Sequence, residues 1–385
     1  MPPSQRHPTL YQSYGERSEH PSLTPLATYL LRLIHLKKTN LCVSADVSTT
    51  AELLQLAEDV GDEICVLKTH CDIVKDFSDK TMKRLTETAK RKRFVIFEDR
   101  KFGDIGNTVQ QQYLSGPLSI VRWAPIVNAH IFPGPAIITA LSEAAQKAIA
   151  AYNTSVQTDI SASPAASAVG GDNDSVHTND EMEVDDSASA EEEPPEYDDR
   201  QGRKHSVVSV STTISTKTEA MSAQPALRAT LSRGSTEEED TDETEDPEVA
   251  LEELGPVPFY RSLLLLAQMS SKDNFFSPEY TEACVKHART NKNFVMGFIA
   301  QRSLNSERDD NFITMTPGVQ LQAGGDALGQ QYNTPRKVIG EAGSDVIIVG
   351  RGVLGASDRR RAAHEYRRQG WKAYEERLRA GRRGR

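Results

Sequence analysis

Eight short apolar runs, rich in β-branched residues, recur along the chain, and each predicts a buried strand. Helix-like segments separate them, and one of these is expected to begin at Ser48 as its N-cap, while another covers residues 134–153. Strands of this kind, alternating with helices, are typical of a parallel sheet with helical crossovers. The runs are residues 41–47, 63–70, 93–100, 124–132, 262–269, 293–301, 311–318 and 345–353.

The number of strand–helix units selects the fold class. Eight units in about 285 residues fit a closed (β/α)8 TIM barrel, and a doubly wound open sheet is the alternative. We expect residues 1–150 to form the first part of the barrel. Residues 256–385 then form the second part, ending in a basic C-terminal helix. That helix could bind nucleic acid, but we interpret it as a solvated basic face and expect neither a nucleic acid nor a membrane as partner.

A long acidic insertion separates the two parts of the barrel. Residues 151–250 contain 24 acidic and 6 basic residues, a net charge of −18, whereas the rest of the chain carries +8. Sequence of this composition has too little apolar surface to offset chain entropy. We therefore expect residues 151–255 to be a disordered insertion between the fourth helix and the fifth strand, on the face opposite the active site. It is either a tolerated loop or a tail for interaction or phosphorylation.

Composition also limits the compartment and the chemistry. No apolar run reaches membrane-spanning length, and the first residues lack the apolar core of a signal peptide, so a cytoplasmic protein is expected. The four cysteines show no CxxC spacing and three of them lie in or beside apolar runs, which favours buried reduced thiols.

Charged residues follow the first three predicted strands. The first ends in Ser44 and Asp46, the second in Lys68 and His70, and the third in Asp99 and Lys101. A spacing of two lets both side chains of a pair point to one face. Active sites of such barrels form where strands end, so several charges converging there indicate a site rather than isolated ion pairs.

The last two strands end in glycines and an arginine. The sequences MTPGV (315–319) and VGRGV (349–353) stand where barrels often bind phosphate. Glycines let backbone N–H groups approach an oxyanion, and Arg351 can make a two-pronged charged contact. We therefore expect a small phosphorylated substrate.

The surroundings of Lys101 suggest its chemistry. Asp99 and Asp104 lie close in sequence and favour the ammonium form, whereas a Schiff-base lysine needs a lowered pKa. A protonated lysine is suited to giving a proton to a carbanion. No His or carboxylate spacing typical of a metal site accompanies it.

These segments resemble the fungal type of the orotidine 5′-phosphate decarboxylase family. The most specific match is FEDRKFGDIGNTV, and the others are LCVSADV, CVLKTHCDI, FVMGFIAQR, MTPGVQL, GDALGQQY and IIVGRG. The matching parts span residues 30–150 and 256–370. The resemblance implies a (β/α)8 barrel, a homodimer with sites at the interface, and no cofactor or metal. It also implies decarboxylation of orotidine 5′-monophosphate to UMP and CO2 in pyrimidine biosynthesis, through a C6 carbanion protonated by Lys101.

The resemblance also assigns residues. The catalytic charges are Lys68, Asp99, Lys101 and Asp104, with Asp104 reaching the partner subunit's site beside Thr108. Asp46 and Lys68 would bind the ribose, Ser270 the pyrimidine edge and Pro317 the base, and His70 is a further substrate-binding residue. The phosphate would be held by Gln330, Tyr332, Gly350 and Arg351.

Two further classes stay open on the residues alone. One is another phosphate-binding barrel, such as an isomerase or a Schiff-base aldolase. The other is a barrel kept as a scaffold for the acidic insertion, which would predict missing charges at the strand ends.

Overall fold

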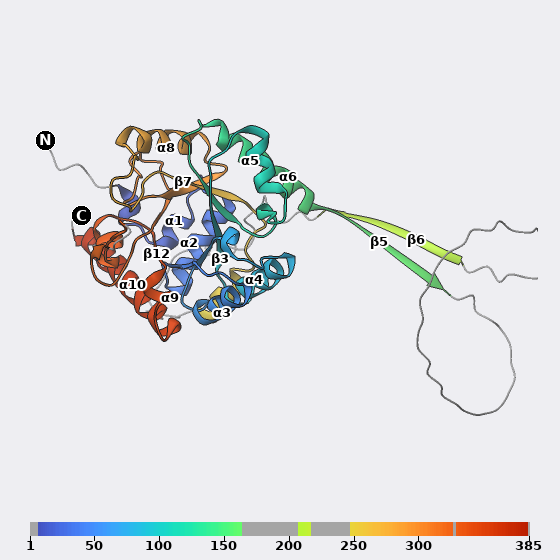
Figure 1. Ribbon diagram of the computed structural model, residues 1–385, viewed down its shortest axis with the longest axis horizontal. Coiled ribbons are helices and arrows are strands. Elements are labelled where there is room, and N and C mark those ends of the chain that lie inside the picture. Colours follow the sequence, from blue (N-terminus) through green and yellow to red (C-terminus); the bar gives the residue numbers. More distant parts are fainter. Residues whose placement is uncertain (1–6, 164–206, 217–246, 326–328, 384–385) are drawn as a thin grey trace, which may run out of the picture. The chain divides into compact units, whose positions relative to one another are not determined.

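The computed structural model describes residues 7–163, 207–216, 247–325 and 329–383. By its internal contacts the chain divides into a large unit and a small one, residues 154–216. The larger unit is a ring of strands surrounded by helices (Figure 1).

Eight parallel strands close into a barrel in the order β1-β12-β9-β8-β7-β4-β3-β2. Every predicted apolar run contains or overlaps one of them, and the closed ring excludes the open sheet. All strands except the carboxyl end of β3 are fully buried, as expected for strands covered on both faces. Their bounds are β1 Leu41–Ala45, β2 Val66–Thr69, β3 Val95–Phe102, β4 Ile126–Ala129, β7 Ser262–Leu266, β8 Val295–Ile299, β9 Ile313–Thr316 and β12 Val346–Val349.

Helices cover the outside of the ring. Helix α3 begins after Thr49 rather than Ser48, because Thr49 forms a capping box with Glu52. The described residues between β8 and β9 form turns and loop instead of a helix. The helices are α1 Tyr14–Ser18, α2 Pro25–Lys37, α3 Thr50–Val60, α4 Asp79–Lys92, α5 Gly106–Leu114, α6 Ala136–Asn153, α7 Pro247–Glu253, α8 Pro278–Thr290, α9 Arg351–Leu354 and α10 Arg359–Arg383, with short turns η1 Pro8–Leu10, η2 Cys71–Ile73, η3 Ile120–Arg122 and the π-helix η4 Arg336–Glu341.

The amino ends of the strands are closed by buried polar contacts. Arg17 of α1 forms a buried ion pair with Asp345, just before β12. Lys37, at the end of α2, points its ammonium group at four backbone carbonyls, those of residues 61, 64, 92 and 93, at 2.7–2.8 Å. These carbonyls belong to the segments that enter β2 and β3, so one side chain ties three helix ends together.

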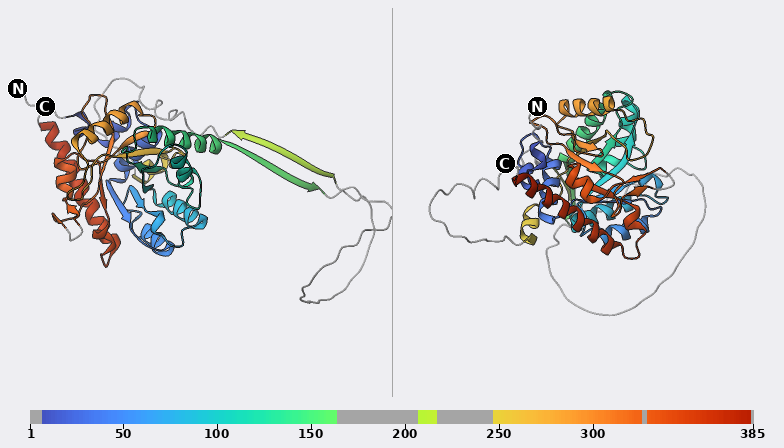
Figure 2. Two further views of the ribbon diagram at one scale, coloured as in Figure 1. Left: turned by 45° about the horizontal axis from the view of Figure 1, so that its top comes forward. Right: turned by 90° about the vertical axis from the view of Figure 1, so that its left-hand side faces the viewer.

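The N-terminal and C-terminal segments pack against each other. The backbone N–H of Tyr14 donates a 2.9 Å hydrogen bond to the hydroxyl of Tyr374 on α10, and the two rings stack with centroids 4.3 Å apart. Figure 2 shows α10 running along the outside of the barrel. The basic C-terminal helix is thus one wall of the barrel unit.

The insertion includes regular structure at its borders. Helix α6 continues to Asn153, and α7 begins at Pro247. Strands β5 (Thr154–Ser163) and β6 (Val207–Thr216) pair antiparallel, from Thr154 opposite Thr216 to Ser163 opposite Val207. No strands were expected here, although β-branched residues recur at alternate positions, at 156, 158 and 160 and from 208 to 216. The expected disorder of residues 164–206 and 217–246 concerns positions outside the described residues.

All four cysteines are buried and unpaired, as expected. Among the helices of the described residues, none has the length and apolar character needed to cross a membrane.

Candidate active site

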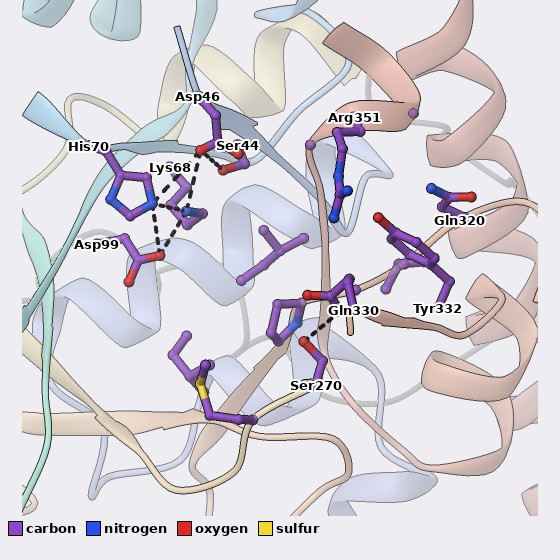
Figure 3. A pocket seen from close by; sticks show the side chains of 18 of the residues that line it. Ser44, Asp46, Lys68, His70, Asp99, Ser270, Gln320, Gln330, Tyr332 and Arg351 are labelled. Atoms are coloured by element: carbon purple, nitrogen blue, oxygen red, sulfur yellow. Dashed lines mark hydrogen bonds and ion pairs between the residues drawn. The ribbon is translucent and has the colours of Figure 1, made fainter. Parts of the chain in front are cut away.

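A pocket of about 230 Å³ opens at the carboxyl ends of the barrel strands. The structure brings eleven of the thirteen predicted site residues to its wall, and the two exceptions are Asp104 and Thr108. Figure 3 shows charged side chains from β1 to β3 on one side of the pocket and Arg351, Tyr332 and Gln330 on the other. The predicted residues that line it are Asp46, Lys68, His70, Asp99, Lys101, Ser270, Pro317, Gln330, Tyr332, Gly350 and Arg351.

Lys68, Asp99 and Lys101 form a chain of alternating charge. Asp99 Oδ2 lies 2.7 Å from Lys68 Nζ, and Asp99 Oδ1 lies 2.8 Å from Lys101 Nζ. Burial alone would raise the pKa of Asp99, but Lys68, His70 and Lys101 hold it far below its usual range. Burial likewise opposes the charge on Lys68, and the Asp99 and Asp46 carboxylates still raise its pKa. Asp99 and Lys68 are therefore charged around neutral pH.

The charge on Lys68 also argues against covalent chemistry there. Forming a Schiff base requires a neutral amine, which a raised pKa disfavours. His70 Nε2 lies 2.7 Å from Lys68 Nζ and 3.3 Å from Asp99 Oδ2, so it closes the cluster on the β2 side.

Strand β3 departs from regular geometry where it carries these groups. Its register with β4 shifts between Glu98 and Phe102, and Lys101 has φ of 50°, in the left-handed region. Non-glycine residues rarely adopt this conformation, and it costs about 1–3 kcal/mol when surrounding structure enforces it. The bulge turns the side chain of Lys101 into the pocket, next to Asp99. In a regular strand, only the spacing of two residues would place the two side chains on the same face.

Asn128 of β4 holds this bulge in place. It is fully buried, its side-chain carbonyl accepts a 2.8 Å hydrogen bond from the backbone N–H of Lys101, and its Nδ2 donates a 2.7 Å bond to Asp99 Oδ1. One side chain thus fixes the backbone of one charged residue and the carboxylate of the other. Asn128 was not among the predicted site residues, although a polar residue inside the apolar run 124–132 was an available signal.

Asp46 lies beside the alternating charges, at the end of β1. The Ser44 hydroxyl donates a 2.7 Å hydrogen bond to Asp46 Oδ1, which lies 3.9 Å from Lys68 Nζ. A Cβ added to Gly350 would come within 3.3 Å of Asp46 Oδ2. A side chain at that position would therefore narrow the gap between the charged side of the pocket and the start of α9.

The opposite side of the pocket carries hydrogen-bonding groups and an arginine. Gln330 Nε2 donates a 2.8 Å hydrogen bond to the Ser270 hydroxyl, joining the segment after β7 to the segment that precedes β11 (Gln331–Tyr332), which pairs with β10 (Gly324–Gly325). The Arg351 guanidinium lies 5.4 Å from the centroid of the Tyr332 ring. This end offers a planar cation and a glycine backbone, the groups suited to an oxyanion.

Behind the site, Glu98 fastens the segment that follows His70. Its fully buried carboxyl group accepts a 2.6 Å bond from the Thr69 hydroxyl and a 3.1 Å bond from the backbone N–H of Cys71. Burial raises the pKa of Glu98 to about 7. Glu98 was not among the predicted site residues.

Asp104 lies on the exposed segment between β3 and α5, and Thr108 is exposed in the first turn of α5. Asp104 accepts a 3.1 Å hydrogen bond from the N–H of Ile105 and a 3.2 Å bond from Nε2 of Gln112 on α5, and neither of these donors lines the pocket. Ile105 is 55% exposed beside it. Asp104 therefore does not reach the pocket of its own chain.

Within the described residues, no group of three or more His, Cys, Asp or Glu side chains is placed to hold a metal ion. A (β/α)8 barrel with a pocket at the carboxyl ends of its strands is typical of an enzyme, and here the pocket has alternating charges on one side and an arginine and a glycine backbone on the other.

Comparison with known proteins identifies the family. Residues 39–366 match the model of the orotidine 5′-phosphate decarboxylase / HUMPS family. An orotidine 5′-phosphate decarboxylase of Aureobasidium pullulans is 47% identical over 370 residues, covering 96% of each chain. One of Hypocrea atroviridis is 46% identical and covers 97% of this chain and 99% of its own. The bovine uridine 5′-monophosphate synthase is 36% identical over 95% of this chain, which corresponds to 53% of that protein.

The chain therefore belongs to the orotidine 5′-phosphate decarboxylase family and is a decarboxylase of pyrimidine biosynthesis.

Proposed function

We propose that the enzyme converts orotidine 5′-monophosphate to UMP and CO2 through a C6 carbanion that Lys101 protonates. The observation that carries the mechanism is the chain of alternating charges, in which Asp99 lies within 2.8 Å of the ammonium groups of Lys68 and Lys101. This geometry and the family resemblance together support a role for each residue of the pocket.

The substrate would lie across the pocket, between its two chemically different sides. The phosphate binds Arg351, Gln330, Tyr332 and the backbone at Gly350, all of which line the far side. Ser270 and Pro317 contact the pyrimidine ring, while Asp46 and Lys68, with His70, hold the ribose. The orotate carboxylate then faces Asp99.

The bond changes follow from this placement. The carboxylate and Asp99 repel each other by roughly 4 kcal/mol if their charges lie ~4 Å apart at an effective dielectric constant of ~20. The C6–carboxylate bond breaks, CO2 leaves and the electron pair stays on C6. Lys101 Nζ faces this pair, stabilises its charge and transfers a proton to it, and water later reprotonates the amine. Because these groups are held in place before the substrate arrives, little reorganisation is needed.

Replacing Lys101 by Ala tests the mechanism. The change removes both the proton donor and the cation, so turnover in an ultraviolet assay of orotidine 5′-monophosphate should fall by several orders of magnitude. The matched control is Lys147→Ala, an exposed lysine on α6, which should keep full activity. Both proteins should give the parent's circular dichroism spectrum.

Activity of folded Lys101→Ala within tenfold of the parent would refute the role of Lys101. The resemblance also implies that no metal is needed, so the parent's rate should be the same with EDTA present, and a metal-dependent rate would contradict the proposed chemistry.

The proposal includes a cytoplasmic homodimer in which Asp104 and Thr108 complete the partner's site. Their exposure outside their own pocket and the exposed Ile105 beside them support this arrangement. The four unpaired cysteines suit a reducing compartment, and cell fractionation tests the location.

Mixed dimers test the shared site. Lys101→Ala and Asp104→Ala chains should each be inactive as homodimers. In a mixed dimer one site receives an intact Lys101 from one chain and an intact Asp104 from the other, while the second site lacks both. Random reassortment makes about half of the dimers mixed, so activity should return to roughly a quarter of the parent value. A verified mixed dimer without activity would place Asp104 outside the partner's site.

A further inference from the structure

A second cavity, of about 590 Å³, lies at the amino ends of the first three strands, away from the active site. Its walls come from the segments that precede β1, β2 and β3 and from α7 and α10. Six of the lining residues are basic and two are acidic. The cavity is therefore a concentration of positive charge that the decarboxylase reaction does not use.

Some of these cations are already neutralised within the barrel. Lys92 lies 2.6 Å from Asp62, and Arg367 lies 3.0 Å from Glu63. Lys38 and Arg93 differ, because within the described residues neither has a carboxylate at ion-pair distance. One guanidinium nitrogen of Arg93, Nη1, is also buried within the protein without a hydrogen-bond partner, a costly state for a charged group.

The backbone fixes where these two cations stand. Lys38 and Arg93 are the C-caps of α2 and α4, and both have left-handed backbones, with φ of 50° and 53°. A cation at a helix C-terminus also stabilises the helix, which would explain both residues without any ligand. That explanation leaves the unpartnered guanidinium nitrogen and the cavity between them unaccounted for.

The chain itself contains a segment of complementary charge that precedes one wall of this cavity in the sequence. Residues 237–246 contain eight acidic residues and no basic residue. They lead directly into α7, which begins at Pro247 and contributes Leu251 and Glu252 to the cavity wall. Ten extended residues span about 33 Å, so the segment can reach any wall of the cavity.

We propose that the acidic segment 237–246 binds in this cavity, against Lys38 and Arg93 of the same chain. The tether places the carboxylates at an effective concentration on the order of millimolar, so several individually weak ion pairs suffice. Such contacts are screened by salt, because the Debye length falls to about 3 Å at 1 M ionic strength. The segment should therefore be bound at low salt and released at high salt.

Carbodiimide coupling of the full-length protein tests this placement, because it joins an amine to a carboxylate only when the two are in contact. Peptide mass spectrometry should find Lys38 joined to carboxylates of residues 237–246 at low salt, and several-fold less at 0.5 M NaCl. Lys147, an exposed lysine on α6, is the matched control and should couple to the segment far less.

One variant separates binding from chance encounters, and a second identifies the products. Arg93→Gln should reduce the Lys38 coupling several-fold. Replacing all eight carboxylates of the segment by amides removes the groups that couple, so this variant is the blank for the cross-linked peptides. If Arg93→Gln does not fold, the test is the salt dependence of the parent's Lys38 coupling relative to that of Lys147. Both variants should keep the parent's decarboxylation rate, because the cavity lies at the other end of the barrel.

Three results would overturn the proposal. One is Lys38 coupling to the segment no more often than Lys147 does. Another is coupling that persists undiminished in folded Arg93→Gln. The third comes from mixing isotope-labelled and unlabelled chains: products that join the two kinds of chain would show that the segment binds another copy.

Discussion

Replacing Glu98 by Gln is expected to change how the stability of the barrel depends on pH. The Glu98 carboxyl group is fully buried behind the active site and accepts hydrogen bonds from Thr69 and Cys71. Glutamine has nearly the same shape and can accept the same two bonds through its carbonyl oxygen, but it does not ionise. The substitution therefore removes a titration while leaving the packing and the acceptor in place.

The size of the effect follows from the pKa of Glu98, which burial raises from 4.5 to about 7. A raised carboxyl pKa means that folding favours the protonated form. Its contribution to stability is fully present below pH 4.5 and is lost as the pH rises through 7. Integrating the linkage between pH 5 and pH 8 gives a loss of about 2.5 kcal/mol in the free energy of unfolding of the parent.

Urea unfolding of both proteins at pH 5, 6, 7 and 8 measures this difference. The two should be similar at pH 5, and the Glu98→Gln protein should be more stable by about 2 kcal/mol or more at pH 8. Histidines that titrate in the same window affect both proteins alike, so they cancel in the comparison. A matched control is Glu143→Gln, an exposed residue on α6, which should follow the parent at every pH.

Parallel pH profiles for the parent and the Glu98→Gln protein would refute the reasoning. They would mean that Glu98 ionises in the folded protein as readily as in the unfolded chain, so that its hydrogen bonds fully offset its burial.

Two further predictions concern the phosphate end and the insertion. Arg351→Ala should weaken phosphate binding by about 2–3 kcal/mol, so kcat/KM should fall at least tenfold for orotidine 5′-monophosphate. It should hardly change for orotidine, which has no phosphate. Steady-state assays with both compounds measure this difference, and equal losses would exclude a phosphate role. Replacing residues 164–206 by a short Gly-Ser turn should leave activity unchanged and the melting temperature within a few degrees, because Ser163 and Val207 are already paired opposite each other. Calorimetry measures the melting temperature of this variant, and a value much lower than the parent's would show that the removed residues stabilise the fold.

The strands were predictable because a barrel strand is buried on both faces and reads as one apolar run. The placement of Asp46, Lys68 and Asp99 at the pocket followed from the same rule, since each stands at the carboxyl end of such a run. The start of α3 at Thr49 was missed by one residue, because Ser48, Thr49 and Thr50 are all acceptable caps and only Thr49 pairs with Glu52 as a capping box.

Other features depend on contacts between distant parts of the chain. Asn128 acts on Lys101 across two neighbouring strands, and no local pattern specifies that pairing. The left-handed backbone of Lys101 was equally hidden, because lysine has no preference for it and the bulge is enforced by its surroundings. The absence of a described helix between β8 and β9 also went unpredicted, since an apolar run fixes a strand but not the shape of the connection that follows it.

The two sides of the pocket come from opposite ends of the chain. Asp46, Lys68 and Lys101 precede the insertion, whereas Tyr332 and Arg351 follow it. A nucleotide held at both sides would therefore act as a non-covalent cross-link between two fragments of one polypeptide. If the chain were cleaved within the insertion, the affinity of the two fragments for each other would rise with nucleotide concentration, by the same mass action that raises the stability of any protein by its ligand. The free energy of nucleotide binding would therefore also contribute to the free energy that holds the two fragments of the barrel together.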